Sequence, residues 1–141
     1  MPMNEAIERI RLADVLPEPV SHYCDAVRAG GYLFISGVVS MDRGGRVVGT
    51  GDAARQAEQI FEHVDRVLEH VHADVSRIVS VLVHLTNMED RARINPVRIR
   101  YFGEHRPAST LVQVTRLVHP DLLVEVTCTA YLGDAANQAR G

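Results

Sequence analysis

The sequence predicts an α+β fold in which one mixed β-sheet carries two helices on a single face. Three observations support this. Glycine-rich turns separate short apolar segments near the beginning, a long amphipathic helix occupies the middle, and Val-rich strands alternate with a shorter helix towards the end. The predicted order is three strands, helix, strand, helix and two strands.

The composition is that of a globular protein. With 141 residues, 46% of them hydrophobic and 23% charged, the chain suffices for one core and fits neither a disordered nor a membrane-spanning class. A net charge of -3 without a run of Lys or Arg provides no basic surface for nucleic acid or anionic lipid. Two distant cysteines, Cys24 and Cys128, indicate neither a disulfide nor a zinc site. Since the N-terminus lacks a signal-peptide pattern, we expect a cytoplasmic protein.

The first part of the chain predicts a β-meander of about three strands. Residues 25–39, DAVRAGGYLFISGVV, contain two apolar segments separated by the Ala29-Gly30-Gly31 sequence of a hairpin turn. A second glycine-rich turn at 41–46 precedes Val47 and Val48, which are expected to form the third strand.

Residues 52–72 predict the clearest helix, because apolar residues recur at gaps of three and four. These residues are Ala57, Ile60, Phe61, Val64, Val67, Leu68 and Val71. Asp52 is the expected N-cap. His63, His70 and His72 are expected on the solvated face of this helix, since their spacing does not favour a metal site.

The next predicted elements are a buried strand at 78–86 and a second helix. The strand sequence IVSVLVHLT follows the first helix in the manner of a crossover connection. Asn95 and Pro96 are expected to begin the second helix, because Asn caps well and Pro is tolerated at the first helical position. Gly103 is expected to end it.

Two final strands are predicted at 110–116 and 122–132, joined around a turn at 119–121. A Val-rich sheet with helices on one face only has a second face that also needs cover. Association with further copies of the chain would supply that cover.

Glu125 is the most informative polar residue. Alternation along its strand places it on the face opposite Val124 and Val126. A carboxylate in an apolar strand is costly without a partner or a task, so a structural ion pair and a water-activating base both remain open. His84, in the preceding buried strand, is expected to be a core histidine bonded to a backbone group.

Several motifs that would define a reaction class are missing from the sequence. It contains no GxxxxGK[ST], GxGxxG, HExxH or GxSxG pattern, so nucleotide-binding, metalloprotease and esterase readings are not supported. Neither cysteine has a base or an orienting acid beside it in sequence, which disfavours a catalytic thiol.

Five segments of the chain carry a family resemblance. HYCDAVRAGGYLFISG, GDAARQAEQIFEHVDRVLEHVHAD, VHLTNMED, NPVRIRYFGEHRPAST and LLVEV occur in this order. Together they resemble the RidA family, also called YjgF or L-PSP. The resemblance implies a single RidA-like domain over 1–141, with a core at about 20–132, an N-terminal segment at 1–19 and a polar C-terminal tail at 133–141.

The resemblance also implies an assembly and an activity. The expected fold is chorismate-mutase-like, in a homotrimer whose sheets form a central barrel and whose clefts lie between subunits. Members of the family hydrolyse small enamines and imines to ketones and ammonia without a metal or an organic cofactor. The resemblance assigns the positioning of water to Glu125 and substrate binding to Tyr23, Gly37 and Asn95, and it implies neither nucleic acid nor membrane as a partner.

The chain departs from the family pattern around the expected cleft. Ser109 stands where the family's Pro-Ala-Arg-Ser turn has an arginine that grips the substrate carboxylate. Arg106 is the nearest alternative cation in sequence, with Arg28 and Arg116 further away. His22 replaces a common proline and is expected to line the cleft.

These departures indicate an altered substrate or lost catalysis. Together with the resemblance, they imply a RidA-like hydrolase of the enamine/imine deaminase type that acts on an altered small-molecule substrate in a metabolic or degradation pathway. A non-catalytic trimer that binds or senses a small molecule is the alternative. RNA cleavage, an older label for the family, is disfavoured by the acidic charge balance.

Overall fold

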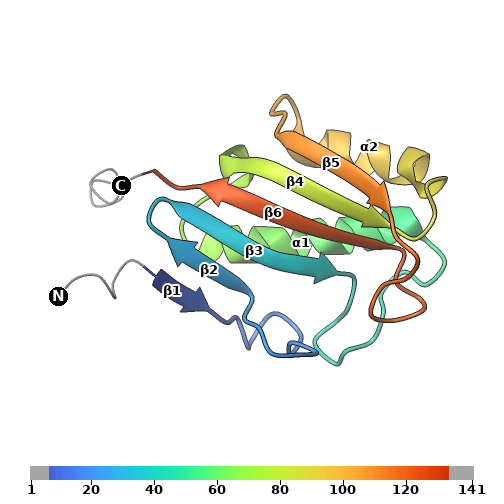
Figure 1. The fold of residues 1–141 in the computed structure, drawn as a ribbon, viewed down its shortest axis with the longest axis horizontal. Coiled ribbons are helices and arrows are strands. Elements are labelled where there is room, and N and C mark those ends of the chain that lie inside the picture. Colours follow the sequence, from blue (N-terminus) through green and yellow to red (C-terminus); the bar gives the residue numbers. More distant parts are fainter. Residues whose placement is uncertain (1–6, 134–141) are drawn as a thin grey trace.

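The structure, a computed structural model, describes residues 7–133 and contains the expected sheet with two helices on one face (Figure 1). Its elements are β1 (Ile7–Ile10), β2 (Ala26–Ala29), β3 (Tyr32–Val39), α1 (Ala53–His70), the short 3-10 helix η2 (Val75–Arg77), β4 (Ile78–Leu85), α2 (Asp90–Phe102), β5 (Ala108–Gln113) and β6 (Val124–Tyr131). The sheet order is β1-β2-β3-β6-β4-β5. The last strand in sequence therefore lies in the middle of the sheet.

The predicted helix at 52–72 and its cap are confirmed. Helix α1 spans Ala53–His70, and the Asp52 carboxylate accepts a hydrogen bond of 3.0 Å from the backbone N–H of Arg55. Its apolar stripe, which includes Ile60, Val64 and Leu68, is fully buried against the sheet. Helix α2 forms the crossover between β4 and β5, which pair in parallel, whereas every other strand pair is antiparallel.

The opening meander differs from the prediction. The hairpin of β2 and β3 is confirmed, but Val47 and Val48 form no strand, and only an isolated bridge joins Met41 to Val47. The third strand is instead β1, which pairs with β2 and belongs to the segment expected to lie outside the core. The outer edge of β2 needs a hydrogen-bonding partner, and Ile7–Ile10 meets that need although it is distant in sequence.

The start of the second helix was predicted too late. Helix α2 begins at Asp90, so Asn95 and Pro96 lie inside it and Asn95 is exposed rather than a cap. The backbone N–H of Asp90 donates to the carbonyl of Asn87, so the preceding turn already starts the helix. The predicted end is confirmed, since Gly103 has a φ of 61°, which glycine adopts without strain.

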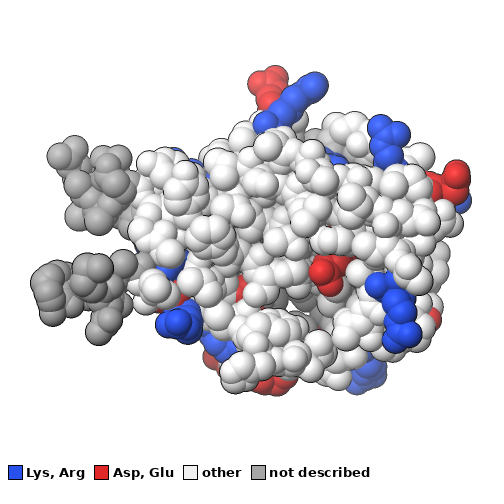
Figure 2. All heavy atoms as spheres, in the orientation of Figure 1, with Lys and Arg blue, Asp and Glu red and all other residues white. Residues whose placement is uncertain are grey.

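The two faces of the sheet differ as the alternation predicted. On β6 the side chains of Val124, Val126 and Cys128 are buried under the helices, and burial raises the pKa of the Cys128 thiol to about 12. On the opposite face Tyr32 and Phe34 remain exposed. Figure 2 shows this open face as mostly uncharged, with charged groups mainly at its margins.

Candidate functional site

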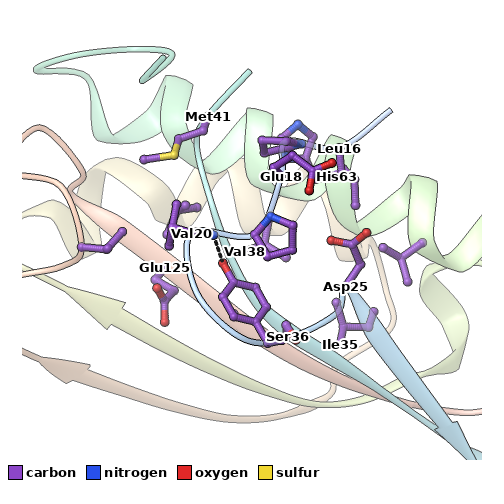
Figure 3. Close-up of a pocket in the computed structure, with 17 residues that line it drawn as sticks. Leu16, Glu18, Val20, Asp25, Ile35, Ser36, Val38, Met41, His63 and Glu125 are labelled. Carbon is purple, nitrogen blue, oxygen red and sulfur yellow. Dashed lines mark hydrogen bonds between the residues drawn. The ribbon is translucent and has the colours of Figure 1, made fainter. Parts of the chain in front are cut away.

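A pocket of about 420 Å³ lies beside β3 (Figure 3). It is bounded by the segment 16–23, by β3, by one turn of α1 and by the start of β6. The residues that line it are Leu16, Pro17, Glu18, Pro19, Val20, Tyr23, Asp25, Ile35, Ser36, Gly37, Val38, Val39, Met41, His63, Val67, Val118 and Glu125. Three of the residues that the sequence singled out, Tyr23, Gly37 and Glu125, thus meet within one chain.

The Glu125 carboxylate lies directly against Gly37. A Cβ atom on Gly37 would stand 2.7 Å from Oε2 of Glu125 and 2.9 Å from its carboxyl carbon. Glycine at this position therefore leaves the space that the carboxylate occupies. Within residues 7–133 no hydrogen bond or ion pair engages the carboxylate of the half-buried Glu125, so the structural ion pair considered from the sequence is not formed in this part of the chain.

Tyr23 holds one wall of the pocket in place. Its hydroxyl accepts a hydrogen bond of 3.2 Å from the backbone N–H of Val20, drawn as the dashed line in Figure 3. Because the hydroxyl oxygen serves as acceptor there, its proton remains available to a ligand. The neighbouring His22 is exposed and does not line the pocket of this chain.

A β-bulge in β3 connects the two sides of the sheet at this pocket. The register between β3 and β6 shifts between Ile35 and Val38, so the ladder is interrupted at Ser36 and Gly37. Ser36 turns to the neighbouring loop instead, where its hydroxyl donates to the carbonyl of Cys24 at 2.7 Å. The pocket can therefore reach from Glu125 on the open face to Ile35, which is buried on the helix side.

His63 contradicts the prediction of a solvated face. It is only 8% exposed, lines the pocket, and its Nε2 lies 3.0 Å from Nε2 of Gln59. Burial lowers the pKa of His63, so the ring is neutral at pH 7. The helical period contained the signal, because residue 63 lies three positions after Ile60 and four before Val67 on the apolar stripe.

Arg11 organises the acidic groups at the far side of the pocket. Its guanidinium lies 2.6 Å from Oδ2 of Asp25 and 3.1 Å from Oε1 of Glu18, and it also donates to the carbonyls of Leu16 and Pro17. The contact with Asp25 and Glu18 raises the pKa of Arg11 despite the opposing effect of burial. This cluster fixes the segment that forms the pocket wall.

Gln56 positions the beginning of β6. Its side-chain amide is fully buried, donates to the carbonyls of Gly49 and Asp121, and accepts from the backbone N–H of Leu123 at 2.8 Å. Two of these three hydrogen bonds, those with Asp121 and Leu123, hold the backbone just before Glu125. This residue was missed as a positioning group, because nothing local in the sequence links position 56 to position 123.

Ser109 lies on the edge strand β5, two strands from β6, and does not line this pocket. It is the register partner of the buried Val81, so its side chain is on the helix side, where Arg98 of α2 donates to its hydroxyl at 2.9 Å. Burial lowers the pKa of Arg98. The cation next to Ser109 is therefore Arg98 and not Arg106, which is exposed in the preceding loop.

The structure also shows where Asn95 and His84 lie. Asn95 lies on the exposed side of α2 and does not reach the Glu125 pocket within the chain. His84 lies on the open face as the register partner of Glu125, and its half-buried ring forms no hydrogen bond at Nδ1. The expected backbone bond at this nitrogen is absent, because alternation turned His84 away from the helices.

Residues 7–133 contain no group of three or more His, Cys, Asp or Glu side chains that could hold a metal ion. In the same part of the chain no helix is long and apolar enough to cross a membrane.

Comparison with known proteins identifies the family and the fold of the chain. The family described as endoribonuclease L-PSP matches residues 14–132. A RutC family protein of Pyrococcus horikoshii is 37% identical over 116 residues, which cover 82% of this chain and 90% of the relative. The 3-aminoacrylate deaminase RutC of Acinetobacter baylyi is 32% identical over 125 residues, or 89% and 98% of the two chains. The crystal structure of RidA from an Antarctic Psychrobacter species superimposes with a TM-score of 0.80 at 29% identity, covering 88% of this chain and 98% of that one. The chain belongs to the L-PSP family, also called YjgF or RidA, and has its fold.

Proposed function

We propose that the protein hydrolyses the C–N bond of a small imine or enamine, with water positioned by Glu125, on a substrate that differs from the family's usual one. The observation that carries this proposal is the half-buried carboxylate of Glu125, which opens into the pocket without a partner in the described part of the chain. Its similarity to a 3-aminoacrylate deaminase and to RidA supports the same reaction class.

The reaction needs a base, a bound water and a way to return protons to nitrogen. An enamine first tautomerises to the imine. The oxygen of water then bonds to the imine carbon while one of its protons passes through Glu125 to nitrogen. The amino alcohol loses ammonia when the hydroxyl proton moves to nitrogen and the C–N bond breaks, which leaves a carbonyl compound. The hydroxyl of Tyr23 can donate a hydrogen bond to the substrate. Gly37 leaves room for the carboxylate of Glu125.

The open sheet face supports a homotrimer. The rings of Tyr32 and Phe34 are exposed, and the Tyr32 ring lies 5.1 Å from that of Tyr131, so an aromatic cluster faces solvent in the single chain. In the assembly that the family resemblance implies, a neighbouring subunit would bring its Ser109 and Asn95 to the Glu125 pocket. We expect a particle of three chains of 15.6 kDa each by light scattering, and a smaller particle for Phe34→Glu.

A non-catalytic binding protein is the second candidate, and Ser109 favours it. A hydroxyl cannot grip a carboxylate as a guanidinium does, so the pocket of such a protein could hold a ligand without turnover. It would show ligand-dependent thermal stabilisation and no ammonia release above buffer. RNA cleavage is not proposed, because the net charge is -3 and the open face in Figure 2 is mostly uncharged. The cytoplasmic location and the single domain over 1–141 stay predictions.

Glu125→Gln tests the function directly. It keeps the shape of the side chain and removes the base, so ammonia release should fall by at least about 100-fold while the melting temperature stays close to that of the wild type. Glu104→Gln, an exposed acid outside the pocket, is the matched control and should retain full activity. Unchanged turnover in folded Glu125→Gln protein would remove Glu125 from the mechanism.

A further inference from the structure

Building on the proposed hydrolysis, we infer that His63 binds the substrate at the end of the pocket opposite Glu125 and recognises a hydroxyl or amide group there. Figure 3 shows Glu125 at one side of the pocket and His63 at the other, near α1, with Val38 between them. A substrate with its C=N carbon at Glu125 would therefore extend along Val38 towards His63.

A chain of hydrogen bonds along α1 places the proton of the His63 ring on Nδ1. The guanidinium of Arg55 can only donate, and it lies 3.2 Å from Oε1 of Gln59, so the amide nitrogen of Gln59 is the atom that faces His63 at 3.0 Å. Because that nitrogen donates, Nε2 of His63 accepts, and the single proton of a neutral ring must then be on Nδ1. Burial lowers the pKa of His63 and keeps the ring neutral at pH 7.

Nδ1 of His63 is an unpaired donor that opens into the pocket. Within residues 7–133 it forms no hydrogen bond. Among the side chains of these residues that are not exposed, Nδ1 of His84 is the one nitrogen or oxygen atom that is both enclosed by protein and unpaired, so Nδ1 of His63 must reach open space. Since His63 is only 8% exposed and lines the pocket, that space is the pocket.

Asp25 supplies an acceptor on the same side of the pocket (Figure 3). Its Oδ2 already accepts from the guanidinium of Arg11 at 2.6 Å and from the backbone N–H of Leu12 at 2.7 Å. Its Oδ1 has no partner within residues 7–133 and is not enclosed by protein. This end of the pocket therefore offers one donor and one acceptor, and a hydroxyl or an amide is complementary because each of these groups both accepts and donates.

The groups at this end of the pocket belong to a single chain. In the proposed trimer a neighbouring subunit would cover the open face of the sheet, where Glu125 lies, whereas His63 belongs to α1 on the other face. The hydrogen bonds among Arg55, Gln59 and His63 lie within one helix. A neighbour would thus add groups at the Glu125 end and leave the orientation of the His63 ring unchanged.

The tautomer of His63 provides the first test, and it does not depend on turnover. In the full chain grown with isotope-labelled histidine, nuclear magnetic resonance distinguishes protonated from unprotonated ring nitrogens, and His63→Asn identifies the signal. We expect a protonated Nδ1 and an unprotonated Nε2 at pH 7.5, which is the less common tautomer of free histidine in water. Gln59→Leu removes the donor to Nε2 and should shift the proton towards that nitrogen. A proton on Nε2 in the wild type would overturn the inference.

The second test compares imines that differ in one hydroxyl group. An L-amino acid oxidase converts norvaline and 5-hydroxynorvaline to 2-imino acids of equal chain length. The pairs 2-aminobutyrate with homoserine and norleucine with 6-hydroxynorleucine vary that length. At the length that spans the pocket, we expect hydrolysis of the hydroxylated imine to be accelerated about tenfold more, because an alkyl group leaves the donor of His63 and the acceptor of Asp25 unpaired.

His63→Asn and His63→Leu form a matched pair, since asparagine and leucine side chains have nearly the same shape. The amide nitrogen of asparagine can occupy the place of Nδ1 and donate, whereas leucine offers no donor, and both variants remove the acceptor of Gln59. The preference for the hydroxylated imine should stay within about threefold of the wild type in His63→Asn and disappear in His63→Leu. His70→Gln changes an exposed residue of the same helix and should keep the wild-type preference.

The outcomes separate this inference from the proposed function. Equal preferences in His63→Asn and His63→Leu, with hydrolysis that is lost in Glu125→Gln, would overturn the inference and leave the hydrolase intact. If no imine is hydrolysed faster than in buffer, the proposed function fails for these substrates and binding decides the inference. The Nδ1 signal of His63 should then shift on addition of 5-aminopentan-1-ol but not of pentylamine, and equal responses to the two amines would overturn the inference.

Discussion

Two polar positions of the sheet, Glu125 on the central strand β6 and Ser109 on the edge strand β5, differ in how their hydrogen-bonding capacity is used. Glu125 on β6 has no partner within residues 7–133 and faces a pocket, whereas Ser109 on β5 already binds Arg98. A carboxylate that faces a pocket without a side-chain partner is free to bind a ligand or a water molecule. A hydroxyl that accepts from a guanidinium is satisfied by the protein itself. The difference directs the search for chemistry to β6, because the hydroxyl on β5 is already engaged in a contact within the chain.

Apart from removal of the Glu125 carboxylate itself, the largest expected effect comes from filling the space that Gly37 leaves. Gly37→Val puts carbon atoms where the Glu125 carboxylate lies, because even a Cβ would stand 2.7 Å from Oε2. The carboxylate must move, and we expect ammonia release to fall by about 100-fold, the usual consequence of displacing a catalytic group by an ångström. The melting temperature should change little, since Gly37 is exposed.

Gly44→Ala is the control for this prediction. Gly44 is also exposed but lies in the turn after Met41, away from Glu125, where a Cβ would approach only Asp42 and Arg46. Its activity should equal that of the wild type. Full activity in Gly37→Val would contradict the role given to Glu125, because its carboxylate would then not need the position that it occupies in the structure.

A smaller effect is expected at the β5 end. Ser109→Arg places a second guanidinium next to Arg98, and the two like charges should lower the free energy of unfolding by about 1 kcal/mol. Adding Arg98→Gln to Ser109→Arg removes the repulsion and should restore stability, which urea denaturation of the wild type and the two variants measures. Hydrolysis of a 2-imino acid should stay within about threefold of the wild type, because the proposed substrate differs from the family's usual one and position 109 lies outside the Glu125 pocket of its own chain. A gain well above tenfold would show instead that only the anchor is missing.

The smallest effect concerns the pH dependence of stability at His63. Burial depresses the pKa of His63 in the folded chain below its ordinary value of 6.5, so the unfolded chain binds the proton more tightly. The stability that the neutral ring provides is therefore complete above pH 6.5 and is lost as the pH falls through the depressed pKa. In His63→Gln the urea midpoint should fall less between pH 7.5 and pH 5 than in the wild type.

His70→Gln is the control on the same helix. His70 is exposed, so this variant should keep the wild-type dependence of the midpoint on pH. If the urea midpoint depends on pH in the same way in the wild type, His63→Gln and His70→Gln, then His63 is solvated. The prediction made from the sequence would then be correct for this residue.

Those parts of the site that depend on local sequence patterns could be predicted from the sequence. Glu125 was placed opposite Val124 and Val126 by a period of two, and the structure confirms that face. Gly37 and Tyr23 came from the family resemblance, and they do meet Glu125 in the pocket. Arg98 was not found, because its contact with Ser109 joins a helix to a strand, and no spacing in the sequence reveals which turn of the helix faces which rung of the strand.

The sequence by itself determined the types of most elements and several of their ends, because hydrophobic periods, the Asp52 cap and the Gly103 stop act between residues that are close in the chain. Only the tertiary structure decided which elements became neighbours: β1 on the edge of β2, β6 in the middle of the sheet, and His63 on the wall of the Glu125 pocket. The physical reason is that burial and backbone pairing are satisfied by the nearest surface in space, and a strand edge or an apolar stripe accepts partners from any distance along the chain.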